Sequence, residues 1–212
     1  MKKQGTLFIV SAPSGAGKSS LINALLNRFN HDDSLRLSIS HTTRLPRPGE
    51  ENHISYHFVS EEEFKSLISR GAFYEYAKVF DHYYGTSREI VEQWLSEGKD
   101  VLFDIDWQGA RQIRKQTPDA RSIFIVPPSI DELRRRLENR GQDPKEVIDS
   151  RMNKAISELS HFSEYDHVII NDDFDESLLT LRSIILSSRS ETTLQTERLH
   201  ELFPQLSGHD HV

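Results

Sequence analysis

The feature that most restricts the fold of this chain is a phosphate-binding pattern close to its start. Residues 12–19 read Ala-Pro-Ser-Gly-Ala-Gly-Lys-Ser, which fits G-x-x-x-x-G-K-[ST] except that Ala12 stands at the first glycine. The apolar run from Thr6 to Ser11 reads as a buried strand, and apolar residues recur at helical spacing over 18–29. A strand, a glycine turn and a helix in this order favour a P-loop over an ordinary glycine-rich turn.

Each part of this loop has a task in holding a nucleoside triphosphate. Gly15 and Gly17 allow the backbone to turn its N–H groups inward around phosphate oxygens. Lys18 reaches the β- and γ-phosphates, Ser19 offers its hydroxyl to Mg²⁺, and the following helix directs its positive end at the anion. We therefore expect ATP to bind along Ala12, Pro13, Ser14, Gly15, Ala16, Gly17, Lys18, Ser19 and Ser20.

A second acidic anchor follows a later apolar run. Val101, Leu102 and Phe103 lead into Asp104, and a carboxylate at the end of a strand suits Mg²⁺ through water. The alternative is that Asp104 caps the helix that starts near Trp107. Beside a P-loop we favour the metal role, so Ser19 and Asp104 are predicted to hold the ion.

The rest of the chain mostly alternates strands with helices. Apolar runs at 101–104, 123–126 and 168–170 predict buried strands. Helical periodicity extends over 87–95, 108–115, 129–140, 145–159 and 174–186. This alternation predicts an α/β fold with a P-loop core, in which a parallel sheet is flanked by helices.

The segment 34–87 has a different character. It is rich in aromatic residues, His and Arg, with alternating runs at 35–39 and 54–58. One helix is expected over 61–69, with Ser60 as its N-cap. We expect an inserted mixed α/β lobe at 34–87, a core at 1–33 and 88–190 with a helical lid at about 138–146, and a C-terminal helix and tail at 191–212.

Charge and composition exclude several classes of protein. The chain has 33 acidic and 26 basic residues, a net charge of −7, which is the opposite of what duplex nucleic acid attracts. It has no cysteine, which excludes disulfides, thiolate metal sites and Cys nucleophiles. The apolar run 7–10 is too short for a signal peptide, and no stretch approaches the length of a membrane span. We expect a cytoplasmic protein without nucleic acid or a membrane as partner.

The lobe carries side chains suited to a second phosphorylated ligand. Arg44 and Arg47 lie in a loop held by prolines, and guanidinium groups bind phosphate oxygens in pairs. Tyr56 and Tyr84 add hydroxyl donors, and Glu75 is a carboxylate among aromatic residues. Taken singly, each of these is more often a surface residue than a ligand.

Together these segments resemble the guanylate kinase family. The similarity covers residues 5 to about 187 and leaves the last residues unassigned. The matching pieces are SAPSGAGKSS, SHTTRLPRPGE, YYGTS, LFDIDWQGA, the Pro-Pro-Ser run 127–129, RLENRG at 136–141 and NDD at 171–173. The resemblance implies transfer of the γ-phosphate of ATP to GMP, with dGMP as a further acceptor and Mg²⁺ as cofactor, in purine nucleotide recycling.

The resemblance also implies a role for individual residues. It implies that the phosphate of GMP is bound by Ser40, Arg44, Arg47, Tyr56 and Tyr84, and guanine by Glu75, Thr86 and Asp106. The arginines that close on the ATP phosphates are Arg136, Arg140 and Arg151, and Asn171 belongs beside adenine and the lid. With Lys18 and Arg44, these three arginines form the expected catalytic set.

The chemistry of the substrates fits these roles. Guanine has N–H donors at N1 and at its 2-amino group, which the carboxylate of Glu75 can accept, whereas adenine lacks both. No general base is needed, because the phosphate of GMP is largely a dianion near neutral pH. No metal is expected at His53 and His57, which point to the same side, and Arg134 and Arg135 are expected to face solvent.

Two other readings stay open, and the sequence sets no oligomeric state. One is a kinase for another small acceptor on the same scaffold. The other is a non-catalytic interaction module, since guanylate-kinase-like domains also occur in scaffold proteins. Those typically lack a working P-loop, whereas Lys18, Ser19 and Arg44 are all present here.

Overall fold

The larger part of the molecule is a parallel five-stranded sheet covered by helices on both faces. The structure is a computed structural model that describes residues 4–79, 81–139 and 145–206. The strand order is β2-β7-β1-β8-β9, and every pairing is parallel. The strands are β1 (Leu7–Ser11), β2 (Leu35–Leu37), β7 (Asp100–Asp104), β8 (Arg121–Val126) and β9 (His167–Ile170).

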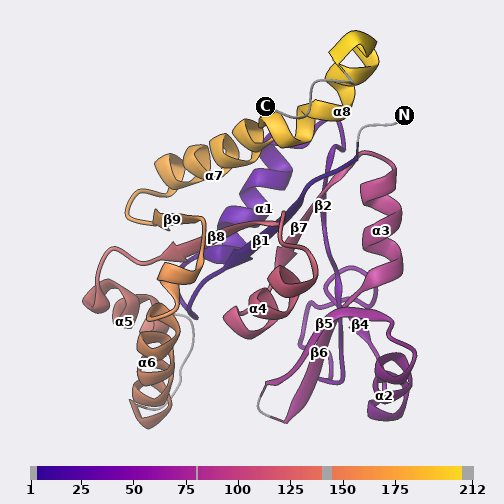
Figure 1. Cartoon of the computed structure of the whole chain (residues 1–212). Coiled ribbons are helices and arrows are strands. Elements are labelled where there is room, and N and C mark those ends of the chain that lie inside the picture. The colour runs from indigo at the N-terminus through magenta and orange to yellow at the C-terminus, as the bar shows by residue number, and fades with distance from the viewer. Residues whose placement is uncertain (1–3, 80, 140–144, 207–212) are drawn as a thin grey trace.

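The apolar runs of these strands are continuous because both faces of the sheet are covered. Alternate side chains of a strand point to opposite faces, so Phe8 and Val10 join one core cluster while Leu7 and Ile9 join the other. Full burial of such a side chain contributes about 1.5–3 kcal/mol. Helices α1 (Lys18–Phe29) and α7 (Phe174–Ser188) cover the first face, and α3 (Arg88–Ser96) and α4 (Trp107–Gln116) cover the second (Figure 1).

A second, smaller sheet of mixed direction lies below the carboxyl ends of the core strands (Figure 1). Its order is β4-β3-β6-β5, with β3 and β4 parallel and the other pairs antiparallel. The strands are β3 (Ser40–Thr42), β4 (His57–Phe58), β5 (Phe73–Val79) and β6 (His82–Ser87). This sheet falls inside the segment expected to form the inserted lobe.

Helix α2 (Glu61–Ser69) covers the small sheet through Phe64. The Phe64 ring is fully buried and stacks on Phe73, with 4.7 Å between ring centroids. Ser60 is the N-cap, as predicted, and its hydroxyl accepts a hydrogen bond from the Glu63 N–H at 3.1 Å. Such a cap stabilises a helix by about 1 kcal/mol.

The segment 34–87 differs from the sequence prediction at two points. The strand β2 pairs with β7 in the core sheet, because alternating leucines predict a strand without indicating which sheet it joins. The run 54–58 is not one strand, since Ile54 is 68% exposed and only His57 and Phe58 form β4. His53 has a φ of 66° and begins a turn over 53–55, which takes up the first part of this run.

The chain passes between the two sheets at two neighbouring points. Ser38 and Ile39 form the first crossing, between β2 and β3, and Ser87, the last residue of β6, forms the second, where the chain enters α3. All three residues line one cavity of about 150 Å³, together with Ile90, Val91 and Trp94 of α3. The small sheet is therefore attached to the core around one largely apolar hollow.

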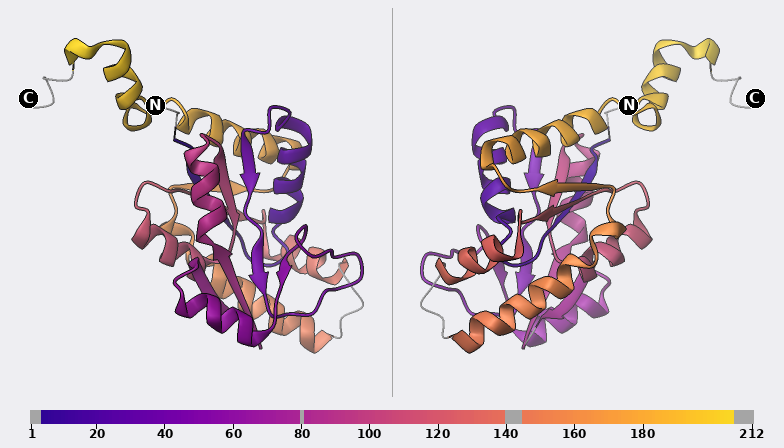
Figure 2. Two further views of the ribbon diagram at one scale, coloured as in Figure 1. Left: turned by 90° about the vertical axis from the view of Figure 1, so that its right-hand side faces the viewer. Right: turned by 90° about the vertical axis from the view of Figure 1, so that its left-hand side faces the viewer.

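Helices α5 (Ile130–Asn139) and α6 (Lys145–Leu159) pack on each other beside the open end of the core sheet (Figure 2). They share a small core of Leu133, Leu137, Ile148, Met152 and Ala155. A one-turn helix, η1 (Phe162–Glu164), follows α6. Residues 140–144 of the expected lid, including Arg140, lie outside the described residues.

At the C-terminal end, α8 (Thr192–Leu202) and η2 (Pro204–Leu206) extend away from both sheets (Figures 1 and 2). The sequence predicts a helix after residue 190, and α8 forms there, directly after α7. Among the described helices, none is both long and apolar enough to cross a membrane.

Candidate functional site

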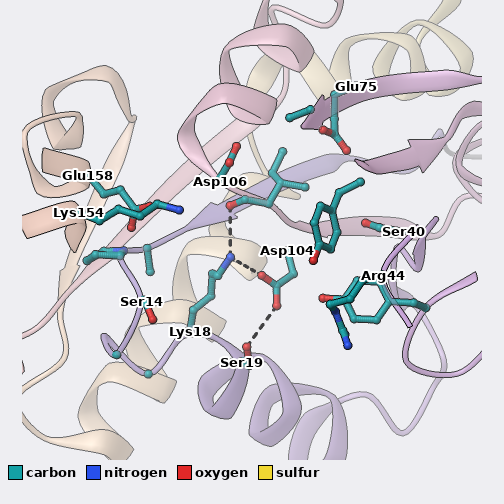
Figure 3. Close-up of a pocket in the computed structure, with 18 of the residues that line it drawn as sticks. Ser14, Lys18, Ser19, Ser40, Arg44, Glu75, Asp104, Asp106, Lys154 and Glu158 are labelled. Carbon is teal, nitrogen blue, oxygen red and sulfur yellow. Dashed lines mark hydrogen bonds and ion pairs between the residues drawn. The ribbon is translucent and has the colours of Figure 1, made fainter. Parts of the chain in front are cut away.

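A cavity lies between the two sheets, at the carboxyl ends of β1 and β7. It has a volume of about 400 Å³. The P-loop forms its floor, the small sheet and its loop 44–56 form one wall, and α6 forms the opposite wall (Figure 3). Ligands of parallel α/β proteins bind at this end of the sheet.

The P-loop has the backbone conformation that its glycines predict. Gly15 and Gly17 have φ of 92° and 95°, which a side chain would strain. A Cβ at Gly17 would also lie 2.4 Å from the Asn171 Nδ2. Helix α1 begins with no side-chain cap, so its first backbone amides face the cavity without a partner from a capping residue.

Lys18, Ser19 and Asp104 converge beside this helix end, as predicted (Figure 3). The Lys18 ammonium forms an ion pair with the Asp104 carboxylate and donates to the Ile105 carbonyl oxygen at 3.2 Å. The Ser19 hydroxyl donates to the other Asp104 oxygen at 3.5 Å. The hydroxyl and the carboxylate are oxygen ligands of the kind that Mg²⁺ prefers, so the residues fit the predicted ion.

Arg44 lies at the opposite end of the cavity and is held by Glu50. Its Nη2 donates to both Glu50 carboxylate oxygens at 2.8 Å, and its guanidinium lies 5.4 Å from the Tyr56 ring centroid. Glu50 also accepts the backbone N–H of Arg47 at 2.8 Å. Hydrogen bonds from Arg44 are the main cause of the lowered pKa of Glu50. Ser40, Arg47, Tyr56 and Tyr84 line the same end, so the structure brings together the five residues expected at the acceptor phosphate.

Glu75 is buried on β5, between the small sheet and α4. It is 5% exposed, and the Thr86 hydroxyl donates to its Oε1 at 2.7 Å. The pKa of Glu75 is raised to about 7. Burial is the largest cause of this rise, and the nearby charge of Asp106 raises the pKa further. A Cβ at Gly109 would lie 2.8 Å from Glu75 Oε2, so glycine allows α4 this close approach.

Asp106 is the third residue of the expected guanine site. Its carboxylate caps α4 by accepting the Gly109 N–H at 2.9 Å, a role that the sequence analysis considered for Asp104 instead. Glu75, Thr86 and Asp106 therefore meet, as the predicted guanine site requires.

Arg136 and Asn171 lie on the outer side of the P-loop. Arg136 Nη2 donates to the Asn171 carbonyl oxygen at 3.0 Å, and the Asn171 side-chain amide donates to the Ala16 carbonyl oxygen at 2.7 Å. Together with Gly15, Gly17 and Ser20 they line a separate cavity of about 250 Å³. Arg151 is half-buried on α6 and is not among the residues that line either cavity.

Three residues of the site were missed from the sequence. Glu50 was quoted in the loop but given no role; Lys154 and Glu158 line the cavity from α6. The two α6 side chains approach to 3.8 Å. The only sequence signal for them is their spacing of three and seven residues from Arg151, which places all three on one helical face.

His41, His53 and His57 lie together, outside the lining of this cavity. His53 and His57 face each other, with 2.7 Å between their Nδ1 atoms, and His41 stacks on His57 with 4.5 Å between ring centroids. Burial is the main cause that lowers the pKa of His41 to about 4. Of the expected solvent-facing arginines, Arg135 is 65% exposed, and Arg134 is 42% exposed in an ion pair with Asp149.

The class of protein follows from three features of this site. A P-loop lies at the end of β1, a lysine–aspartate pair lies beside it, and the facing lobe carries arginines and a buried carboxylate. Together they define a P-loop phosphotransferase of the nucleotide kinase class. Comparison with known proteins gives the particular family. The guanylate kinase family profile matches residues 4–188. The chain belongs to the guanylate kinase family.

Individual relatives agree over nearly the full length. The chain is 57% identical over 206 residues to a guanylate kinase of Shewanella oneidensis, covering 95% of this chain and 99% of the relative. It is 58% identical over 195 residues to a guanylate kinase of Vibrio parahaemolyticus, covering 92% and 94%. The crystal structure of guanylate kinase from Anaplasma phagocytophilum superposes with a TM-score of 0.77 at 34% identity, covering 96% of this chain and 98% of that one.

Proposed function

We propose that this protein transfers the γ-phosphate of ATP to GMP, and also to dGMP, and releases ADP and GDP for purine nucleotide recycling in the cytoplasm. The observation that carries the proposal is that one cavity is lined both by a P-loop and by Glu75 and Asp106, with Thr86 hydrogen-bonded to Glu75. Membership of the guanylate kinase family supports it.

At the donor end, backbone amides of the P-loop receive the phosphates of ATP. The positive φ of Gly15 and Gly17 aims these amides inward, and Lys18 leaves its pair with Asp104 to contact the β- and γ-phosphates. Ser19 and Asp104 would hold Mg²⁺, which neutralises phosphate charge when bound. Arg136 and Arg151 are proposed to add positive charge as the helices of the lid approach.

At the acceptor end, side chains hold the phosphate of GMP. Arg44 and Arg47 supply guanidinium donors, and Ser40, Tyr56 and Tyr84 supply hydroxyl donors around the same space. The bound phosphate is itself the nucleophile, so the residues position it and compensate its charge without removing a proton.

The buried carboxylate of Glu75 selects the base. In its ionised form it would accept the N1 and 2-amino donors of guanine, and the Thr86 hydroxyl, which donates to Glu75 Oε1 in the free protein, would turn from it to donate to O6. Adenine would leave Glu75 without donors in a site that is 5% exposed, a mismatch that costs about 10⁴-fold in comparable sites.

One acceptor panel tests the proposal. ADP formation from ATP and Mg²⁺ is measured with GMP, dGMP, AMP, CMP, UMP and IMP as acceptors. GMP is expected to lead, followed by dGMP, with AMP lower by at least about 10³-fold in kcat/KM. Equal use of AMP and GMP would contradict the guanine site, and transfer to none of them would contradict the kinase assignment.

A further inference from the structure

The outer edge of the small sheet is bonded to the core through side-chain amides of α4. Strand β5 is the last strand of that sheet, so one of its edges has no neighbouring strand. The Gln112 side chain takes that place: its Oε1 accepts the Tyr76 N–H at 3.2 Å, and its Nε2 donates to the Tyr76 carbonyl oxygen at 2.9 Å. One turn further along α4, Gln116 Nε2 donates to the Tyr74 carbonyl oxygen at 2.6 Å. The backbone is thus held to α4 on both sides of Glu75.

A glutamine side chain is well suited to this task. The edge of a strand presents N–H groups and carbonyl oxygens that need partners. Glutamine carries a donor and an acceptor on one planar amide, so it can pair with both backbone groups of a single residue, as a neighbouring strand would. An ionised carboxylate has no donor, and an apolar side chain of the same length has neither group. The pairing with Tyr76 therefore depends on the amide itself.

The same face of α4 carries the groups that surround Glu75. Asp106 is the N-cap of α4, and Gly109, Gln112 and Gln116 follow at intervals of three, three and four residues, which places them along one side of the helix. A Cβ at Gly109 would lie 2.8 Å from Glu75 Oε2, so the carboxylate lies close against the helix. Helix α4 therefore positions Asp106 directly and holds Glu75 through the two glutamines.

Recognition of guanine needs the Glu75 carboxylate at a fixed place. The N1 and 2-amino donors of the base must meet its two oxygens together, and a displacement of about 1 Å is enough to weaken such a site. On its other edge β5 pairs with β6, and the register of this pairing shifts between Phe73 and Glu75. Pairing with β6 alone therefore does not set the distance from Glu75 to α4.

We propose that Gln112 is a positioning residue for base selection, whose amide sets the distance between Glu75 and Asp106 and so maintains the preference for GMP over other purine nucleotides. Gln112 is not among the residues that line the cavity, whereas Glu75 and Asp106 are, so it acts through the strand. Gln116 supports the same strand through one hydrogen bond, and its contribution is smaller. This inference rests on GMP as the proposed acceptor.

Acceptor discrimination by Gln112→Met tests the assignment. Methionine keeps the length of the side chain and removes both hydrogen bonds to Tyr76. The ratio kcat/KM is measured with GMP, with AMP and with IMP, which lacks the 2-amino group. The preference for GMP over each of the others is expected to fall about tenfold, while the KM for ATP changes less than about twofold.

Gln93→Met is the matched control. It removes a glutamine hydrogen bond at the surface of α3, from Gln93 Nε2 to Glu97 Oε1 at 3.0 Å, and it should leave all three acceptor preferences unchanged. Equal losses of preference in Gln93→Met and Gln112→Met would overturn the assignment.

The pH dependence separates positioning from a loss of stability. Burial is the largest cause of the raised pKa of Glu75, so loosening β5 from α4 admits water and should lower that pKa below about 7. The rise in the KM for GMP on acidification should then begin at a lower pH than in the wild type. A variant that unfolds at a lower temperature but keeps the wild-type preferences and pH profile would refute the positioning role.

Gln116→Met provides a second test at an exposed position, which does not depend on the folding of Gln112→Met. It should lower the preference for GMP over IMP by about threefold, because one bond to the strand is lost. Unchanged discrimination in an active Gln116→Met protein would count against the hold of α4 on β5. Failure of the wild type to phosphorylate GMP would instead contradict the proposed function.

Discussion

The two ends of the cavity prepare for phosphate by different means. At the donor end the hydrogen-bond donors for phosphate are backbone amides. Gly15 and Gly17, in the turn after the buried strand β1, orient these amides toward the cavity. At the acceptor end the donors are side chains, and Arg44 keeps its place because another side chain, Glu50, holds it. Backbone geometry is set by the local sequence, whereas a side-chain clamp needs a second layer of partners. The donor end is therefore the one that sequence alone describes best.

Both ends nevertheless share one electrostatic arrangement. Lys18 is paired with Asp104, and Arg44 is paired with Glu50. Each pair keeps a cation oriented and neutralised before substrate arrives, at sites that are 11–28% exposed. Substitutions at the two ends should separate a loss of chemistry from a loss of acceptor binding.

The largest effect is expected from Lys18→Ala at the donor end. It removes the ammonium that faces the transferring phosphate and should lower kcat/KM by at least about 10³-fold, about 4 kcal/mol. Steady-state kinetics measures the loss, and circular dichroism and thermal melting check that the fold is retained. Unchanged turnover would refute the donor assignment.

Arg44→Ala should have the next largest effect, confined to the acceptor end. We expect kcat/KM for GMP to fall by about 10²-fold, mainly through KM, with the KM for ATP changed less than about twofold. Arg44→Lys keeps the charge but loses the planar fork, so it should recover only part of the loss. A rise in the KM for ATP equal to that for GMP would erase the distinction between the two ends.

Glu75→Gln tests base selection and its pH dependence. Guanine binding requires the ionised carboxylate, and the pKa of Glu75 is raised to about 7 in the free protein. Protons therefore compete with GMP, and the KM for GMP should rise as the pH falls through about 7. The glutamine variant should lose about 10²-fold of its preference for GMP over AMP and should lack this part of the pH dependence. The titration of the GMP phosphate is common to both proteins and cancels in the comparison. An identical pH profile for both proteins would count against the role of Glu75.

The smallest effect is expected from Glu50→Gln. The substitution weakens the hold on Arg44 without removing the guanidinium, so the KM for GMP should rise about fivefold while kcat changes less than about twofold. When Arg44→Ala is already present, adding Glu50→Gln should raise the KM for GMP almost no further, because Glu50 acts through Arg44. Additive losses would show that Glu50 has another target.

Helices with local signals were predicted accurately. The helices at 18–29, 61–69 and about 145–159 correspond to α1, α2 and α6, because periodicity and capping are carried within each segment. The strands β5 and β6 were not predicted. Both pair mainly within the small sheet and contain mixed aromatic and polar residues, so their conformation depends on distant partners.

The site divides in the same way. The P-loop residues could be predicted because their function lies in the backbone of a single turn. The contact of Thr86 with Glu75 follows from the β5–β6 register, which shifts between Phe73 and Glu75 and has no local signal. Lys154 and Glu158 share a helical face with Arg151, but that spacing does not tell whether the face meets a cavity or solvent.

The paired crossings beside the 150 Å³ hollow have a consequence for how such proteins diversify. A segment that leaves and rejoins its host at adjacent positions can be exchanged as a cassette with little disturbance to the host. A new acceptor preference would then require matched changes in the small sheet and in α4, where Glu75 lies against Gly109, while the P-loop could stay as it is. The hollow therefore lies where the chain leaves and rejoins the core sheet, apart from the residues that line the phosphate cavity.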